Sequence, residues 1–513
     1  MKRNAIILAA LLVLVPATVK AQFNETNNLF YFAQRAPQSN QLNPAFFPST
    51  LYLQLPALNS LQLGLPLSIS DIAKYDSVQG ANIIDVNHIL DVLGETGNDS
   101  RFRMGFDLNV VGLGLKIAGV FVDANMQLKT SLGFTLPFNA ISTVLQGNVG
   151  DDGRAIPEMT LLDGDLLDLQ MYLETSVGAG FHVPLTGLTV GAHVKLLSGL
   201  LNINTQNTRV SFNTEDGYDA VSAKIYYEVM GASIVPVNTS DTAGFSLSDI
   251  TGNLMDQIKD MGLSLIDING GNNGVAFDIG AKYDIGPLTV SASINDLSAG
   301  IHWHNNVFHM VPKGGQSTIE FDGMDITNLL DGGNINVDSL TNYLEGQIDG
   351  MIPTVLTDTG DFWYSVPTKL NLGATANLGI LKAGILFHGQ WDRGLLSKNT
   401  YSSFSEAYND VLGNYNEVKN TFRSNTTLSV GVNLFNWVEV IAGSSFVYEK
   451  GQKITMDNFL NPGLGIIVTP ATLFQAYFMM DYASSMYLTQ MKAFNFKFGF
   501  NIIMGGNSKT RIL

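Results

Sequence analysis

The chain has 513 residues, and its 28 basic against 45 acidic side chains give a net charge of −17, which argues against nucleic acid as a partner because phosphates call for a basic surface. With 45% hydrophobic residues, 14% charged residues and 51 Gly, it is too apolar to be a disordered chain. The absence of Cys excludes disulfides, thiolate metal sites, Cys nucleophiles and lipid attachment through an N-terminal Cys.

Residues 1–21 have the three parts of a secretory signal peptide. Lys2 and Arg3 are followed by an apolar run over Ala5–Val15, and a small-x-small cleavage site ends at Ala21. An uncleaved anchor helix is the alternative, but it would need roughly 20 apolar residues. We therefore predict cleavage after Ala21, so that the mature chain starts at Gln22.

The rest of the chain is dominated by alternation of apolar and polar residues, as in Lys369–Leu378, Leu381–Asp392 and Phe494–Ile502. Successive side chains of a strand point to opposite faces, so each run has an apolar and a polar side. A secreted antiparallel sandwich is the alternative. Runs of roughly 9–11 residues cross a bilayer as tilted strands, and closed barrels satisfy the backbone in hydrocarbon. We predict an all-β protein that forms a transmembrane antiparallel β-barrel with a polar interior.

Short connections join neighbouring runs, and longer polar segments lie between these hairpins. The short ones are at Pro184–Gly187, Gly286-Pro287, Leu378–Leu381, 435–437 and Pro470-Ala471. Counting runs over residues 49–503 gives fourteen to eighteen strands, of which we choose about fourteen; separate runs begin near Leu113, Thr130 and Arg209. This rhythm predicts short periplasmic turns and long external loops.

The long segments have features of their own. Short helices are predicted over Asp85–Leu93, Gly244–Met261 and Asp338–Ile348, from apolar spacing and capping residues. Gly314–Thr368 has nine acidic residues and no Lys or Arg. Such an acidic loop could bind divalent cations, or its charges could simply keep an exposed loop solvated. We favour the second interpretation.

No catalytic residue, cofactor site or metal site is predicted. His302 and His304 share one strand face, a geometrically possible pair of metal ligands, but no neighbouring acid is fixed by the sequence and a pair of lumen or rim histidines is the simpler interpretation. There is no Gly-x-Ser-x-Gly, no His followed two residues later by Ser, and no phosphate-binding loop. We predict that the protein is not an enzyme and has no cofactor.

Gln41–Pro48 resembles the start of a group of outer-membrane proteins of Bacteroidota that form a domain-of-unknown-function family, and Val366–Ala374 resembles a second segment of that group. The resemblance covers nearly the whole mature chain. Asn43-Pro44-Ala45 is more distantly similar to the FadL long-chain fatty acid transporter superfamily, which includes subunits of the type IX secretion and gliding apparatus. In those relatives an N-terminal segment plugs a barrel of fourteen strands.

This resemblance implies that residues 22–48 form a plug segment, with Asn43, Pro44 and Ala45 in its turn. The local sequence agrees, because Asn before Pro favours an extended or turn conformation. An ordinary turn before the first strand is the alternative. Barrels of this kind commonly end on an aromatic residue, whereas here residues 504–513 form a C-terminal tail.

We predict that the protein lies in the lipid of a Gram-negative outer membrane as a non-enzymatic structural or accessory subunit of an envelope assembly or secretion machine, with envelope proteins as partners. One alternative is a FadL-like channel holding a hydrophobic ligand in the barrel. The polar inward faces of the strands argue against an apolar lumen. The Gly-rich strands, however, could supply the kink that a sideways opening through the wall requires. The other alternative is a surface adhesin or receptor that acts through its acidic loops.

Overall fold

The computed structural model describes most of the residues of the predicted barrel. The described residues are 28–48, 51–65, 67–76, 81–84, 88–91, 101–135, 138–139, 142, 158–164, 166–214, 221–234, 271–312, 317–321, 330–331, 334–335, 353–356, 360–391, 395, 422–434, 437–446, 461–471, 473–483 and 493–504. The predicted signal peptide, the helices predicted at 244–261 and 338–348, most of the acidic segment 314–368, and all of the predicted tail except Met504 lie outside them.

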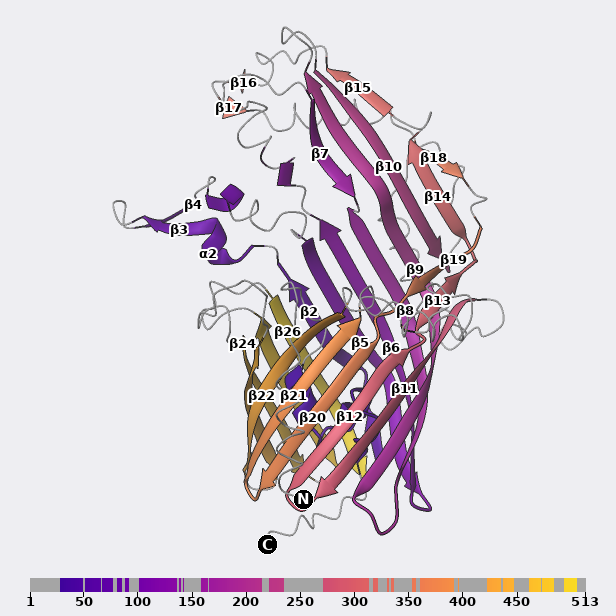
Figure 1. Ribbon diagram of the computed structural model, residues 1–513, viewed down its shortest axis with the longest axis vertical. Helices are drawn as coiled ribbons and strands as arrows, with labels where there is room; N and C mark the ends of the chain where they lie inside the picture. Colours follow the sequence, from indigo (N-terminus) through magenta and orange to yellow (C-terminus); the bar gives the residue numbers. More distant parts are fainter. Residues whose placement is uncertain are drawn as a thin grey trace.

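Fourteen strand positions close into an antiparallel barrel (Figure 1). In order around the wall they are β1 (Leu51–Gln54) with β2 (Ala57–Gly64), β5 (Arg101–Ile117), β6 (Val120–Thr135), β8 (Leu167–His182), β9 (Leu188–Thr214), β11 (Asn272–Ile285), β12 (Leu288–Leu297), β20 (Lys369–Leu378), β21 (Leu381–Trp391), β22 (Phe422–Leu434), β23 (Val438–Phe446), β24 (Asn461–Ala471), β25 (Phe474–Ala483) and β26 (Ala493–Met504). The barrel closes because β26 pairs with β25 on one side and with β1 and β2 on the other. The predicted fold class and strand number are confirmed.

The first wall position is made of two short strands, β1 and β2, which both pair with β5 and β26. Between them lie Leu55 and Pro56. Pro56 has no backbone N–H to donate to a neighbouring strand, whereas the Leu55 N–H still donates to the Phe500 carbonyl at 3.0 Å. The break therefore lies at the residue that cannot take part in the ladder.

Tight turns join consecutive wall strands at one end of the barrel (Figure 1). The turns that follow β5, β8, β11 and β20 each contain a residue with positive φ, namely Gly119, Leu185, Gly286 and Gly379. Three of these turns, at Pro184–Gly187, Gly286-Pro287 and Leu378–Leu381, lie where the sequence predicts them. The opposite end carries the longer connections.

The sheet continues beyond the barrel at the end opposite the tight turns, as Figure 1 shows above the wall. β9 has 27 residues; its first part pairs with β11, and its second part pairs with β10 (Val221–Ser233). The other strands of this extension are β7 (Glu158–Gly164), β13 (Gly300–Trp303), β14 (Val307–Pro312), β15 (Ser317–Phe321), β18 (Pro353–Leu356) and β19 (Phe362–Ser365). The runs predicted to begin near Leu113, Thr130 and Arg209 are not separate strands, because these residues lie within β5, β6 and β9.

The extension has an apolar core where it meets the barrel. Leu200, Leu201, Phe308 and Met310 are buried in one cluster. Trp303 is buried in a second cluster, next to Gly199 of β9. The extension is thus packed onto the wall by its own apolar side chains.

The remaining regular elements are short. β3 (Ala73–Asp76) pairs with β4 (Ala81–Ile84), and β16 (Leu330–Asp331) pairs with β17 (Asn334–Ile335). The helices are η1 (Asn28–Phe32), η2 (Pro37–Gln41) and α2 (Ile69–Ile72), and residues 88–91, inside the predicted helix 85–93, are helical. No helix in the described part of the chain is long and apolar enough to span a membrane.

The wall strands place apolar residues outside and polar residues inside. In β11, Val275, Phe277 and Ile279 are exposed, whereas Asp278 between them is fully buried. This inverts the arrangement of a soluble β-protein, whose apolar face is the buried one.

Candidate functional site

The N-terminal segment, residues 28–48, lies inside the barrel and contacts walls on opposite sides of it. From η1, the Asn28 amide donates to Asn425 Oδ1 in β22 at 2.9 Å. The ring centroid of Phe30 lies 5.0 Å from that of Tyr477 in β25. The Tyr31 hydroxyl lies 2.9 Å from Ser291 Oγ in β12. Burial raises the pKa of Tyr31 to about 12, so this hydroxyl stays neutral and available for hydrogen bonding.

The second helix of the segment adds polar contacts to other strands. Gln38 and Asn501 of β26 exchange two amide hydrogen bonds, at 2.5 and 3.0 Å. The Asn40 amide donates to Asp123 Oδ2 of β6 at 2.9 Å. These are buried polar groups with specific partners, so the segment is fixed in register against the wall.

Asn43, Pro44 and Ala45, the residues singled out by the sequence, form a tight turn against β9, β11 and β12. The Asn43 side-chain oxygen accepts the Ala45 N–H at 2.9 Å, and the Phe46 N–H donates to the Asn43 carbonyl at 2.8 Å. The Asn43 amide nitrogen donates to the strand carbonyls of Ala281 and Ala292 at 3.4 and 3.3 Å. The Asn43 side chain therefore closes the turn and attaches it to the wall.

Two wall glycines allow this approach. A Cβ at Gly191 of β9 would overlap the Pro44 carbonyl, and a Cβ at Gly280 of β11 would overlap Asn43 and Pro44. Any other residue would push the turn away from the wall, since only Gly leaves the space free.

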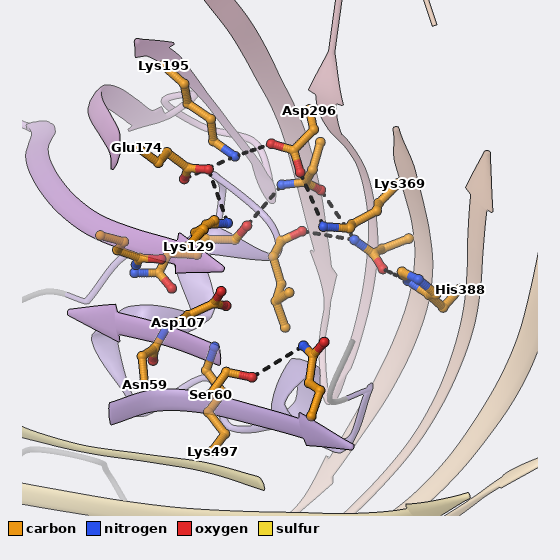
Figure 2. Close-up of a pocket in the computed structure, with 16 residues that line it drawn as sticks. Asn59, Ser60, Asp107, Lys129, Glu174, Lys195, Asp296, Lys369, His388 and Lys497 are labelled. Carbon is orange, nitrogen blue, oxygen red and sulfur yellow. Dashed lines mark hydrogen bonds and ion pairs between the residues drawn. The ribbon is translucent and has the colours of Figure 1, made fainter. Parts of the chain in front are cut away.

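A polar cavity of about 70 Å³ lies in the lumen next to Gln41 and Leu42 of the segment (Figure 2). Its charged lining comes from β5, β6, β8, β9, β12, β20 and β26. The lining residues are Gln41, Leu42, Asn59, Ser60, Gln62, Asp107, Gln127, Lys129, Glu174, Lys195, Asn295, Asp296, Lys369, Asn371, His388 and Lys497. Leu42 is the one aliphatic side chain among these lining residues.

Buried and half-buried ion pairs hold most of these charges. Lys195 Nζ lies 2.6 Å from Asp296 Oδ1, 2.9 Å from Asp278 Oδ2 and 3.5 Å from Glu174 Oε1. Lys129 Nζ lies 3.1 Å from Glu174 Oε2. Lys369 Nζ lies 3.4 Å from Asp296 Oδ2. Removing one partner would leave an uncompensated buried charge, so the network acts as a unit.

A histidine links this network to the N-terminal segment. His193 Nδ1 lies 3.4 Å from Asp278 Oδ2, and His193 Nε2 lies 3.3 Å from Asp123 Oδ2. The same Asp123 oxygen accepts the Asn40 amide. A continuous series of polar contacts thus runs from the segment, through the wall side chains, to the cavity.

Backbone strain accompanies the network at the end of β12. Asp296 and Ser298 have φ of 56° and 60°, in the left-handed region that non-Gly residues rarely adopt. The Asp296 N–H donates to Asp278 Oδ1 at 2.8 Å, and its carbonyl accepts the Thr368 hydroxyl at 3.0 Å. These contacts hold the Asp296 carboxylate between Lys195 and Lys369.

The predicted histidine pair lies elsewhere, at the extension. The ring centroids of His302 and His304 are 5.0 Å apart, and His302 Nε2 lies 3.2 Å from Asp361 Oδ2. Trp363 stacks on His302 at 4.6 Å. Within the described ranges, no three His, Asp or Glu side chains are grouped to hold a metal ion.

The sequence did not single out the cavity residues as a site. Each of the charged cavity residues is a polar residue on the inward face of an alternating strand, and this pattern predicts only that the barrel interior is polar. The pattern does not say which inward residues from different strands meet.

Comparison with known proteins places the chain in a family. Residues 44–481 match the family of unknown function DUF5723, and the chain belongs to that family. No curated protein matches the chain.

Solved barrels resemble the chain only in broad outline. The Pseudomonas putida toluene transporter TodX is 11% identical, with a TM-score of 0.36 over 91% of this chain and 92% of TodX. A Pseudomonas aeruginosa FadL homologue is 11% identical, with a TM-score of 0.39 over 95% of this chain and 98% of the homologue. The translocator domain of the autotransporter NalP from Neisseria meningitidis is 7% identical, with a TM-score of 0.28 over 93% and 99%. At these scores the likeness carries no conclusion about function.

Proposed function

We propose that the protein is an outer-membrane barrel closed by its own N-terminal segment, and that it serves as a non-enzymatic structural or accessory subunit of an envelope assembly or secretion machine. The observation that carries the proposal is the fit of residues 28–46 inside the lumen. Leu29, Phe30 and Tyr31 are at most 1% exposed. Burial of each such apolar side chain contributes about 1.5–3 kcal/mol, so displacing the segment is unfavourable.

The polar contacts of the segment support a permanent closure. Moving the segment out would separate Gln38 from Asn501 and Asn40 from Asp123, and would expose the packed face of η1. A gate that opens readily has few buried contacts and low local stability. This segment has the opposite properties.

The surface of the barrel and the N-terminal sequence support an outer-membrane location. The exposed apolar residues of the wall suit acyl chains, and a cleaved signal peptide over residues 1–21 would deliver the chain through the inner membrane. The tight turns would then face the periplasm and the extension would face outward. We propose a Gram-negative, Bacteroidota envelope as the setting, with other envelope proteins as partners.

A FadL-like passage for hydrophobic molecules is the competing proposal. Such a passage needs an apolar pocket inside the barrel. The lumenal cavity is instead lined by charged and amide side chains, which favours a hydrophilic interior. A receptor or adhesin role that acts through the acidic segment 314–368 is a further proposal. Its test is to measure divalent-cation binding before and after deletion of that segment.

Single-channel recording tests the closure directly. In planar bilayers, we expect the mature chain to show no steady conductance and a variant lacking residues 22–48 to show open-channel steps. A shift in electrophoretic mobility on heating would confirm that both barrels are folded. Steady conductance of the complete chain, or a closed barrel without the segment, would contradict the proposal.

Affinity purification in mild detergent tests the role as a subunit. We expect envelope proteins to co-purify in stoichiometric amounts. The protein could instead be isolated as a monomer without partners, and deletion of its gene could abolish uptake of hydrophobic compounds. These two results together would contradict the role as a subunit and favour a passage for hydrophobic molecules.

A further inference from the structure

One lysine in the lumenal cavity forms no ion pair with a described carboxylate. Lys497 of β26 is 7% exposed and lines the cavity. Its ammonium lies 4.6 Å from the ring centroid of Phe30, and it has no carboxylate within 4.0 Å among the described residues. A buried ammonium without an anion is costly, so this position suits an anionic group of an occupant.

Two amide donors of the same cavity are also unpartnered. The side-chain nitrogens of Gln41 and Gln127 are buried and have no hydrogen-bond acceptor within the described part of the chain. A buried donor left unsatisfied costs about 1–3 kcal/mol. Together with Lys497, these groups offer N–H donors to a molecule that carries acceptor oxygens.

One carboxylate of the cavity also forms no ion pair within the described part of the chain. Asp107 of β5 lines the cavity and attracts Lys129 and Lys497, but no ion pair of Asp107 falls within 4.0 Å among the described residues. An anion bound at Lys497 would leave this negative charge uncompensated. A cation bound at Asp107 would leave Lys497 uncompensated.

The register fixes the spacing of these two charges. Ser60 of β2 pairs with Asp107 on one side and with Lys497 on the other. Residues directly opposite one another point to the same face of a sheet, so Asp107 and Lys497 both point inward (Figure 2). With neighbouring strands about 4.8 Å apart, their Cα atoms lie about 10 Å apart, and their head groups flank one part of the cavity.

We propose that this cavity binds a small zwitterionic amino acid, whose carboxylate accepts hydrogen bonds from Lys497 and the two amides and whose ammonium donates to Asp107. The cavity volume of about 70 Å³ corresponds to about five to seven water molecules at 10–15 Å³ each. Glycine or alanine, with five or six non-hydrogen atoms, fits that space. This proposal goes beyond the role as a subunit and does not depend on it.

Titration calorimetry on the full mature chain in detergent tests the site, with glycine, alanine, acetate and methylammonium as probes. We expect glycine and alanine to bind at least tenfold more tightly than acetate or methylammonium, because only the zwitterions compensate both charges. This comparison uses the unaltered protein and is independent of how any variant folds.

Variants then assign the contacts. Lys497→Met and Asp107→Asn should each weaken glycine binding at least tenfold, and Lys497→Gln provides a milder second variant. Lys116→Met is the matched control, because Lys116 lies on β5 near the tight turns and does not line the cavity. Heat-dependent electrophoretic mobility shows which variants fold.

Three results would overturn the proposal. The first is no glycine binding by the unaltered chain at millimolar concentration. The second is acetate binding as tight as glycine binding, which would indicate a simple anion site. The third is equal glycine binding by the folded Lys497, Asp107 and Lys116 variants, which would place the ligand elsewhere.

Discussion

Gly191 and Gly280 are the residues on which the fit of the N-terminal segment most depends. Gly191→Ala would place a methyl group inside the Pro44 carbonyl, and neither backbone can move without disturbing its ladder or turn. We expect Gly191→Ala to lower the free energy of unfolding by about 1–3 kcal/mol, the usual range for overpacking. Urea unfolding in lipid vesicles measures this loss.

Gly431→Ala is the matched control for this prediction. Gly431 is also a buried wall glycine, on β22, but the nearest atom to its added Cβ is 3.4 Å away. We expect a change within about 0.5 kcal/mol. Equal losses in the two variants would show that Gly191 is sensitive for a reason other than the segment.

At the scale of single residues, the sequence predicts only features that depend on neighbouring residues in the chain. The turn at Asn43-Pro44-Ala45 is readable, because Asn-Pro restricts its own backbone. The need for Gly at 191 and 280 is not readable, since the atoms that require it belong to a turn about 150 and 240 residues earlier in the chain. For the same reason, the sequence does not reveal that Lys497 and Asp107, which form no ion pair among the described residues, line one cavity.

The N-terminal segment is the element whose attachment can be measured separately. Asn43→Ala removes the two hydrogen bonds to the carbonyls of Ala281 and Ala292 and the bond that closes the turn. We expect it to loosen the segment by about 1–3 kcal/mol without opening the wall, because the strand ladders are unchanged.

Cysteine labelling reports this loosening, since the chain has no Cys of its own. Ser39 is fully buried and its hydroxyl has no hydrogen-bond partner in the described part of the chain, so Ser39→Cys is a mild probe. We expect maleimide to react with this thiol at least fivefold faster when Asn43→Ala is also present. Equal rates would mean that Asn43 does not hold the segment.

Strand boundaries show where pattern analysis of elements fails. β5 carries a bulge between Asn109 and Val111, and the buried positions of β6 change phase at Gln127 and Leu128. Each change of phase interrupts the alternation and resembles the start of a new strand, which explains the wrong starts near Leu113 and Thr130. In β9 the strand passes from the barrel into the extension, so one long strand changes its surroundings midway.

At the scale of the whole molecule, the alternation was sufficient to predict the barrel. The apolar and polar residues alternate with a period of two, and short hairpins join the strands at one end. In hydrocarbon every strand must have a partner on both sides, and a closed barrel satisfies this requirement. The extension was not predicted, because its strands show the same alternation as the wall. The cavity network was not predicted either, because it gathers charges from seven strands.

The placement of the barrel in a bilayer gives the last prediction. Ile279 and Ile285 lie on the same outward face of β11 and are 54% and 52% exposed, but Ile279 is mid-strand whereas Ile285 adjoins the tight turn. An Arg facing lipid destabilises a barrel by about 2–4 kcal/mol at the midplane and about 0–1 kcal/mol near the interface. Folding titrations in vesicles should therefore show a large loss for Ile279→Arg and a small one for Ile285→Arg. In water both sites would accept Arg equally, so similar small losses for the two variants would mean that this face of the barrel does not contact lipid.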